Sequence, residues 1–220
     1  MIVMKEYSPK VFDHISQLPG FSEQSVRTHL VLYEGYVNNT NLLAEMMREW
    51  LAVGKSGTIE WAEMKRRFAW EFNGMRLHEY YFENLTATAT ALDRQSQLYT
   101  KIEEDFGPYE LWERGFKGTG GMRGIGWVIL AYDVQTGRLF NVWLGEHDTG
   151  LLVDTRPLLV MDLFEHAFLL DYGLKRKDYE EAFFNVIDWG RVEKRLEACL
   201  KDQPIVVGEK RRRRATDFHN

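Results

Sequence analysis

The stretch Met161–Gly173, MDLFEHAFLLDYG, places Asp162, Glu165 and His166 inside a largely apolar run, and the segments around it decide the fold. Asp162, Glu165 and His166 are costly to bury unless each has a partner. If the chain turns helical after Asp162, a spacing of four puts Asp162 and His166 on one face, where a carboxylate and an imidazole can hold one ion. The alternative is a capped core helix, with Asp162 as N-cap and His166 hydrogen-bonded in the core.

Short strands precede this stretch. PLLVMD, which begins at Pro157, is an expected strand that leads directly into Asp162. GWVILAYD and RLFNVWLG are rich in branched and aromatic residues and flank the turn VQTG, so they are expected to form a β-hairpin. Tyr109–Lys117 has a helical pattern that the following GTGG should end.

Two long helical patterns lie upstream. The first runs from Ser22 to about Leu51, with a break expected near residues 38–40, and the second from about Ile59 to Leu85, with Gly74 as an expected irregularity. The Gly/Ser turn near residues 55–57 joins them, which indicates an antiparallel helical hairpin.

The order of these elements predicts an α+β protein: an N-terminal antiparallel helical hairpin followed by a C-terminal domain of a small three-stranded antiparallel sheet with flanking helices. The small, polar segment 86–97 is the expected linker. We therefore expect a helical hairpin domain at 1–90, an α/β domain at 91–205 and a basic polar tail at 206–220. Asp188 is the expected N-cap of the last helix, WGRVEKRLEACL.

Composition limits the class of protein. The chain has 220 residues, 45% of them hydrophobic, which is enough for a substantial core. A net charge of -5 argues against a nucleic-acid partner, although Lys210–Arg214 reads KRRRR. No apolar run reaches the ~18 residues of a membrane span, and the N-terminus has no apolar signal region, so we expect no membrane partner and a cytoplasmic protein. With only one cysteine, Cys199, any metal must be held by nitrogen and oxygen.

Three of the six histidines, His29, His78 and His166, lie in strongly apolar contexts. Each one alone is better explained as a hydrogen-bonded core histidine than as a metal ligand. Together with Asp162 they form a donor set suited to iron, manganese or zinc, with room for one solvent molecule. No H-E-x-x-H motif occurs, so the commonest helical zinc-protease site is absent.

Five segments resemble the iron/manganese superoxide dismutases, in that family's order and at similar intervals over about residues 10–196. They are GFSEQSVRTH…YVNNTN, FNGMRLHEYYFENL, GIGWVILAYD, DLFEHAFLLDY and DYEEAFFNVIDW. The family's D-x-W-E-H motif here reads DLFEH, with Phe164 where tryptophan is usual. By this resemblance the metal ligands are His29, His78, Asp162 and His166. The family fold, a helical hairpin followed by an α/β domain, agrees with the pattern above.

The resemblance also implies roles around the metal. Tyr36 resembles the gateway tyrosine at the substrate funnel, and Trp127 resembles a wall of the pocket. Glu165 resembles the glutamate that crosses the dimer interface to a ligand histidine of the other subunit, and Tyr179 resembles the interfacial tyrosine. Without the resemblance, ordinary core or interface packing would be the preferred explanation for Tyr36, Trp127 and Tyr179.

His147, in LGEHDTG, occupies the place where many manganese members have a glutamine that bonds the metal-bound solvent. A histidine at this place is similar to a variant of some archaeal members. Our hypothesis is that His147 tunes the proton affinity of that solvent and thereby the metal's potential. The alternative is an exposed loop histidine.

The first helix departs from the family, which typically has eight residues from the first ligand histidine to the gateway tyrosine. Here His29 to Tyr36 is seven. At about 100° per residue, seven steps return the side chain to within ~20° of the same face, whereas eight would need a bulge. We expect a helix without a π-type bulge that presents both side chains to the site. The shortening also removes the histidine that partners the interfacial tyrosine, and Tyr33 is its nearest substitute.

The resemblance implies a superoxide dismutase, an oxidoreductase that converts superoxide to oxygen and hydrogen peroxide by redox cycling of one mononuclear ion with proton-coupled bound solvent. We expect one iron or manganese ion per subunit, with iron slightly favoured, in a homodimer, with a tetramer as an alternative. A non-haem iron oxygenase would normally use two histidines and one carboxylate, so the third histidine argues against it. A catalytically impaired family member that serves as a metal-binding or structural protein is the other alternative, because Phe164, Phe184 and the shortened helix depart from the family.

Overall fold

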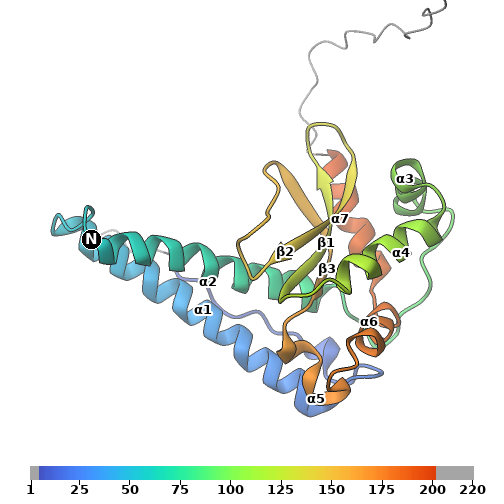
Figure 1. The fold of residues 1–220 in the computed structure, drawn as a ribbon, viewed down its shortest axis with the longest axis horizontal. Helices are drawn as coiled ribbons and strands as arrows, with labels where there is room; N and C mark the ends of the chain where they lie inside the picture. The colour runs from blue at the N-terminus through green and yellow to red at the C-terminus, as the bar shows by residue number, and fades with distance from the viewer. Residues whose placement is uncertain (1–4, 202–220) are drawn as a thin grey trace, which may run out of the picture.

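Two long helices form one layer of the molecule and carry a small sheet with further helices at one end (Figure 1). The structure, a computed structural model, describes residues 5–201. Helices α1 (Glu23–Ala52) and α2 (Ile59–Glu83) contact each other along their lengths. Each begins at a side-chain cap: the hydroxyl of Ser22 accepts from the Ser25 amide, and that of Thr58 accepts from the Trp61 amide. The predicted helical hairpin is confirmed.

Neither long helix is interrupted where the sequence suggested. The break expected near residues 38–40 is wrong, because the polar side chains there are satisfied without leaving the helix. The Thr40 hydroxyl donates to the Tyr36 carbonyl (2.7 Å), and the Asn39 amide donates to Glu71 across the hairpin (3.3 Å). The irregularity expected at Gly74 is also wrong. A Cβ on Gly74 would lie 2.6 Å from the Tyr36 ring, so this glycine admits the ring of the facing helix instead of bending its own.

The sheet has three antiparallel strands, β1 (Gly126–Asp133), β2 (Leu139–Gly145) and β3 (Thr155–Asp162), in the order β2-β1-β3. It confirms both the predicted hairpin and the third strand, and with them the α+β class. β1 is central and almost wholly buried, and its Trp127 pairs with Leu144 on one side and Asp162 on the other. At Gly126 (φ 143°) a Cβ would lie 1.9 Å from the Leu144 carbonyl oxygen, so only glycine fits where β1 begins.

The remaining helices surround the sheet. α4 contacts β1 and β2, α7 contacts β3, and α2 contacts β3 from the helical layer. α4 continues through Gly118 to Gly120, beyond the predicted end, and Asp188 caps α7 as expected by accepting from the Arg191 amide (3.0 Å). These helices are η1 (Asp13–Ile15), α3 (Gln97–Phe106), α4 (Tyr109–Gly120), η2 (Glu165–Ala167), α5 (Leu169–Tyr172), α6 (Arg176–Phe184) and α7 (Trp189–Lys201), with η for a 3-10 turn.

α3 begins at Gln97, the last residue of the expected linker, and continues through residues for which the sequence analysis named no element; the division at residue 90 stays a prediction. The expected tail at 206–220, with its basic run Lys210–Arg214, lies outside the described residues. Within residues 5–201, no helix is both long enough and apolar enough to cross a membrane.

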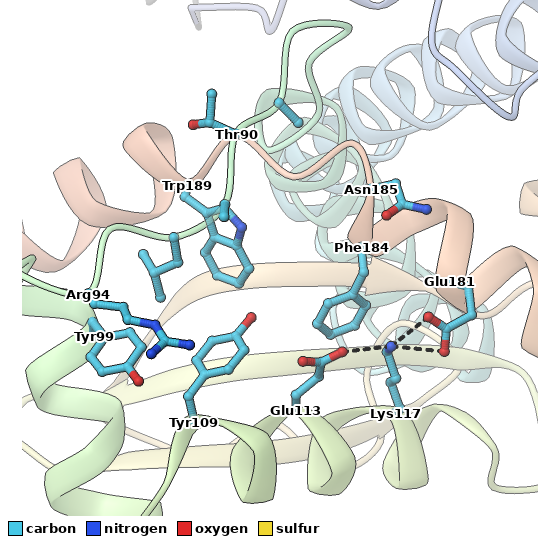
Figure 2. Close-up of a pocket in the computed structure, with 13 residues that line it drawn as sticks. Thr90, Arg94, Tyr99, Tyr109, Glu113, Lys117, Glu181, Phe184, Asn185 and Trp189 are labelled. Carbon is cyan, nitrogen blue, oxygen red and sulfur yellow. Dashed lines mark hydrogen bonds and ion pairs between the residues drawn. The ribbon is translucent and has the colours of Figure 1, made fainter.

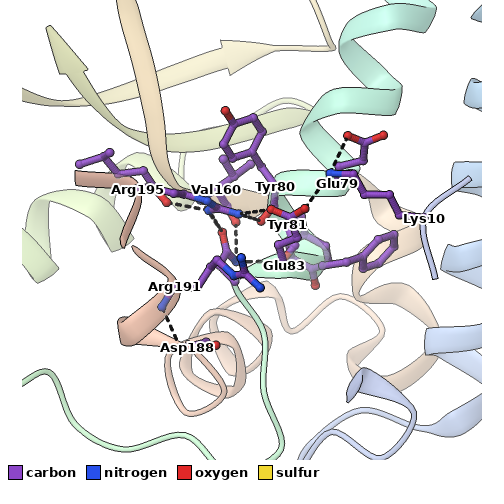
Figure 3. Close-up of polar contacts among 12 residues, drawn as sticks. Lys10, Glu79, Tyr80, Tyr81, Glu83, Val160, Asp188, Arg191 and Arg195 are labelled. Carbon is purple, nitrogen blue, oxygen red and sulfur yellow. Dashed lines mark hydrogen bonds and ion pairs between the residues drawn. The ribbon is translucent and has the colours of Figure 1, made fainter. Parts of the chain in front are cut away.

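A polar network centred on Arg195 of α7 ties the layers together (Figure 3). Its guanidinium donates to the carbonyls of Leu158 in β3 (2.7 Å) and Tyr80 in α2 (3.0 Å), and pairs with Glu83 (3.2 Å). Lys10 reaches the same Glu83 from the N-terminal segment (2.7 Å). Because the Arg195 side chain is only 11% exposed, its partners have little access to water that could replace it.

Replacement of Arg195 by methionine should lower the free energy of unfolding by about 2–4 kcal/mol, because two carbonyls lose their donor and Glu83 loses a cation. Arg191→Met is the matched control, since Arg191 is on the same helix and exposed; it should change stability by less than about 0.5 kcal/mol. Urea unfolding measures both values. Equal stability of the two variants would contradict the structural importance of the network.

Candidate metal centre

Four side chains from four separate elements meet between the helical layer and the sheet. His29 comes from α1, His78 from α2, Asp162 from the last position of β3 and His166 from η2. One ligand atom of each lies within 4.8 Å of those of the others. The Nε2 atoms of His29, His78 and His166 lie 3.1, 3.7 and 3.0 Å from Oδ2 of Asp162. The four residues singled out in the sequence therefore converge.

Asp162 and His166 approach each other without the helix that their spacing suggested. Asp162 ends β3, its Oδ1 accepts from the Phe164 amide (2.8 Å), and a 3-10 turn then returns His166 to Oδ2. The expected helix after Asp162 is wrong, and so is the helix N-cap interpretation. Because β3 is paired along its length, it holds the Asp162 carboxylate in the core. The tight turn after β3 then brings His166 back to this carboxylate, as a helical turn would have done.

His78 shows most directly that the cluster fits a metal ion. Its Nδ1 lies 2.6 Å from the Gly74 carbonyl, to which it donates, so Nε2 carries a lone pair. This Nε2 is buried and has no hydrogen-bond partner among the described residues. Burial lowers the pKa of His78 well below its ordinary value and also lowers that of His29, which keeps both rings neutral. A buried neutral imidazole with a free lone pair is the ligand form of histidine.

Asp162 supplies the negative charge of the cluster. Burial by itself raises the pKa of this carboxyl, but the charge of His166 and the hydrogen bonds from His166 and His29 together hold it well below its ordinary value. The carboxylate is therefore ionised although it is fully buried. Three nitrogens and one carboxylate oxygen form a donor set that suits iron, manganese or zinc, and four protein ligands leave a further position for solvent or substrate.

His147 and Tyr36 lie beside the cluster and are joined by a directional hydrogen bond. The Trp127 indole N–H donates to Nδ1 of His147 (3.0 Å), so in the neutral ring the proton is on Nε2, 2.9 Å from the Tyr36 hydroxyl. Burial lowers the pKa of His147 to about 4 and raises that of Tyr36. Near pH 7, His147 therefore donates to the Tyr36 oxygen, which leaves the Tyr36 proton free to point elsewhere.

α1 is a continuous α-helix from end to end, so the expectation of no π-type bulge is confirmed. Tyr36 stacks on the ring of His78 (centroids 5.0 Å apart) while His29, two turns earlier, reaches Asp162. The expectation for Tyr33 is wrong. Its hydroxyl donates to Glu79 (3.2 Å) and accepts from the Lys10 amide (3.0 Å), whereas the hydroxyl of Tyr179 bonds Asp162 and Tyr81.

Glu165 and Tyr179 differ in exposure: one lies at the surface of the chain and the other in its interior. Glu165 is exposed on the turn that carries His166. Tyr179 is fully buried, and its hydroxyl donates to the Asp162 carbonyl (2.7 Å) and contacts the Tyr81 hydroxyl (3.3 Å). The expected interfacial place of Tyr179 is therefore wrong for this chain. α6 returns beneath the end of β3, so the ring supports the backbone of Asp162 from inside.

Three further residues complete the surroundings of His147. The ring of Phe164 lies between those of His147 (4.6 Å) and His166 (5.2 Å), nearly parallel to both. Trp70 contacts the edge of His147 (4.5 Å), and its indole N–H donates to Glu146 (2.9 Å). Phe164 was noted in the sequence only as a departure from the family motif. No sequence pattern singled out Trp70 and Glu146, since the two residues come into contact only in the folded chain.

A cavity of about 420 Å³ lies elsewhere, between α4, α6, α7 and the segment before α3 (Figure 2). Lys117 crosses it and pairs with Glu113 (2.7 Å) and Glu181 (2.8 Å), and Tyr99 stacks on Tyr109. None of the four clustered residues lines this cavity. Two cationic side chains line the cavity, Arg94 and Lys117, and Lys117 is paired with two carboxylates.

The comparisons with known proteins agree with this geometry. Residues 94–195 match the family described as iron/manganese superoxide dismutases, C-terminal domain. A relative named superoxide dismutase [Mn] 2 from Haloferax volcanii is 32% identical over 89% of this chain and 97% of its own length. Relatives named superoxide dismutase [Fe] are 35% identical in Cupriavidus metallidurans (85% and 94% covered) and 33% identical in Aquifex pyrophilus (86% and 91% covered). The chain belongs to the iron/manganese superoxide dismutase family.

Proposed function

We propose that this chain is a superoxide dismutase, which converts two superoxide ions and two protons into one molecule of oxygen and one of hydrogen peroxide. The observation that carries the proposal is the cluster of three imidazoles and one carboxylate, in which the buried Nε2 of His78 has a lone pair and no hydrogen-bond partner among the described residues. The names of the relatives support the same activity.

His29, His78, Asp162 and His166 would hold the ion. When bound, an iron or manganese ion supplies the one-electron change that both halves of the reaction need, which zinc does not supply. Asp162 contributes the only negative charge of this set, so the net charge of the site depends on a single carboxylate. Tyr179 holds the backbone of that residue through the Asp162 carbonyl, which restricts where the carboxylate points.

Tyr36 and His147 would hold the proton that the reduced substrate needs. Nε2 of His147 donates to the Tyr36 oxygen, so the Tyr36 hydroxyl is free to donate into the site. Trp127 fixes this direction, because its indole N–H occupies Nδ1 and leaves only Nε2 protonated in the neutral ring. The hydroxyl keeps its proton at neutral pH, since burial raises its pKa.

We further propose one ion per subunit, with iron slightly favoured and manganese accepted, since the donor set suits both metals. We propose a cytoplasmic homodimer in which Glu165 reaches a ligand histidine of the other subunit. Two features support this surface: the exposed side chain of Glu165 has no hydrogen bond or ion pair within residues 5–201, and Leu169 and Leu170 beside it are 45% and 53% exposed.

Protein purified from its native host should contain about one iron or manganese ion per chain and should remove superoxide. Asp162→Ala should lose more than about 90% of both, because the three imidazoles lose the carboxylate that completes the site. Asp178→Ala, an exposed carboxylate on α6, is the matched control and should keep both. Metal analysis and a superoxide-removal assay test this. Wild-type protein with a full complement of metal and no activity would support the structural or metal-binding alternative.

His147→Gln should change how stability depends on pH. The pKa of His147 is about 4 in the folded chain and about 6.5 when unfolded, so the folded state binds fewer protons between these values. The contribution of His147 to the free energy of unfolding is complete above about pH 6.5. This contribution decreases by about 3 kcal/mol as the pH falls toward 4.

Glutamine does not titrate in this range, so the difference in unfolding free energy between wild type and His147→Gln should favour wild type more at pH 7 than at pH 4. Denaturant unfolding at several pH values measures it. The pH profile of superoxide removal should shift as well if His147 tunes the site. Parallel stability curves and unchanged profiles would contradict this role.

Glu165→Ala should weaken subunit association by about ten-fold or more, because a charged contact buried at an interface is removed. Glu197→Ala, on the exposed side of α7, is the control and should leave association unchanged. Sedimentation over a dilution series gives the dissociation constants. A wild-type protein that is monomeric at micromolar concentration would rule out the proposed dimer without affecting the metal site.

A further inference from the structure

Glu146 adopts a backbone conformation that its side chain does not favour. It follows β2, precedes His147 and has φ 51°, in the left-handed region that is unfavourable for a residue with a Cβ. Gly145, the last residue of β2, directly precedes it and Gly150 follows in the same loop, so glycine occurs at neighbouring positions. A glutamate in the strained position indicates that its side chain has a task.

That side chain reaches α2. One carboxylate oxygen of Glu146 accepts from the indole N–H of Trp70 (2.9 Å). The face of the same indole is covered by the Arg67 guanidinium, 4.1 Å from the ring centroid, and Arg67 is held in turn by its ion pair with Glu71 (2.5 Å). Trp70 is therefore fixed through its edge and through its face, and its orientation depends on the contact with Glu146.

Trp70 forms one side of the environment of His147. Its ring lies 4.5 Å from that of His147 at 68°, and 5.5 Å from that of Tyr36. The other sides are occupied by Phe164, stacked at 4.6 Å, and by the Trp127 indole N–H on Nδ1. Displacement of Trp70 would remove the aromatic ring whose centroid lies nearest to that of His147.

The fold of the loop does not require this contact. Gly145 and Thr149 exchange two backbone hydrogen bonds (2.8 and 3.1 Å), and the amide of Glu146 donates to the Ile125 carbonyl (3.1 Å). Because these bonds already hold the loop backbone, loss of the side-chain contact should move the rings near His147 and leave the loop in place.

We propose that Glu146 is a positioning residue, which through Trp70 presses His147 against Tyr36 and so sets the width and hydrogen-bonding geometry of the approach to the metal centre. The contact couples α2, which carries His78, to the loop that carries His147. The effect of this contact on substrate access rests on the proposed function. Its effect on the positions of the aromatic rings does not.

The test distinguishes three properties of residue 146: the length of its side chain, the charge of that side chain and the strain of its backbone. Asparagine adopts the left-handed conformation more readily than glutamate but is too short to reach Trp70, whereas glutamine keeps the length and an acceptor oxygen without the charge. The variants are Glu146→Asn, Glu146→Gln and Trp70→Phe, and Glu63→Gln, an exposed ion-pair residue on α2, is the control. All four are expected to fold, which thermal unfolding checks.

Two readouts are used on metal-loaded protein. The first is the separation of His147 Nε2 and Tyr36 Oη in crystal structures, which should exceed 3.5 Å in Glu146→Asn and Trp70→Phe but not in Glu146→Gln. The second is the affinity for azide, a small linear anion, from spectroscopic titration. Azide dissociation constants in Glu146→Asn and Trp70→Phe should differ from that of Glu146→Gln by about five-fold, the equivalent of one hydrogen bond.

The proposal is supported if Glu146→Gln keeps the wild-type separation and azide affinity while Glu146→Asn and Trp70→Phe change both by equal amounts. If all variants keep the His147 to Tyr36 separation and the azide affinity, the proposal is overturned. If Glu146→Gln behaves like Glu146→Asn and differs from Glu63→Gln, charge at the entrance and not positioning is the cause, which also overturns it. Wild-type protein that lacks superoxide removal but shows the structural differences would refute the proposed function and leave this inference standing.

Discussion

The structure depends on keeping one carboxylate, Asp162, ionised where water does not reach it. A buried carboxylate without partners would cost far more than a domain's whole stability, so the surrounding chain has to compensate it. His29 and His166 supply hydrogen bonds to Oδ2, the Phe164 amide supplies one to Oδ1, and Tyr179 holds the backbone carbonyl. These partners come from α1, the loop after β3, η2 and α6, which explains why distant parts of the chain must fold together.

The long helical layer has to present its own two ligands at a single point without distortion. α1 does so by placing His29 and Tyr36 seven residues apart, near the same face of a straight helix. α2 does so through Gly74, whose missing side chain leaves room for the ring of Tyr36 and whose carbonyl accepts from Nδ1 of His78. One glycine thus sets both the approach of the helices and the orientation of a ligand histidine.

The proton-bearing groups are ordered by the tautomer of one ring. Trp127 donates to His147, His147 donates to Tyr36, and the Tyr36 proton is left for the site. The order follows from the low pKa of the buried imidazole, because a doubly protonated ring would place two N–H groups opposite each other at Trp127. A network with a fixed direction of donation is suited to a reaction that delivers protons to a buried substrate.

The sequence by itself determined the α+β class, the helical hairpin, the three strands, the four clustered residues and the absence of a bulge between His29 and Tyr36. The elements depend on local periodicity and the missing bulge on the spacing of seven, whereas the four clustered residues were indicated by their apolar contexts and by the family resemblance. Only the tertiary structure decided that residues 38–40 and Gly74 stay helical, that Asp162 ends a strand, that Tyr179 lies inside the chain, and that Trp70 and Glu146 hold each other beside His147. In each of these cases the deciding partner is far away in sequence, and the free energy of a contact across elements exceeds the small local preference that a sequence pattern reports.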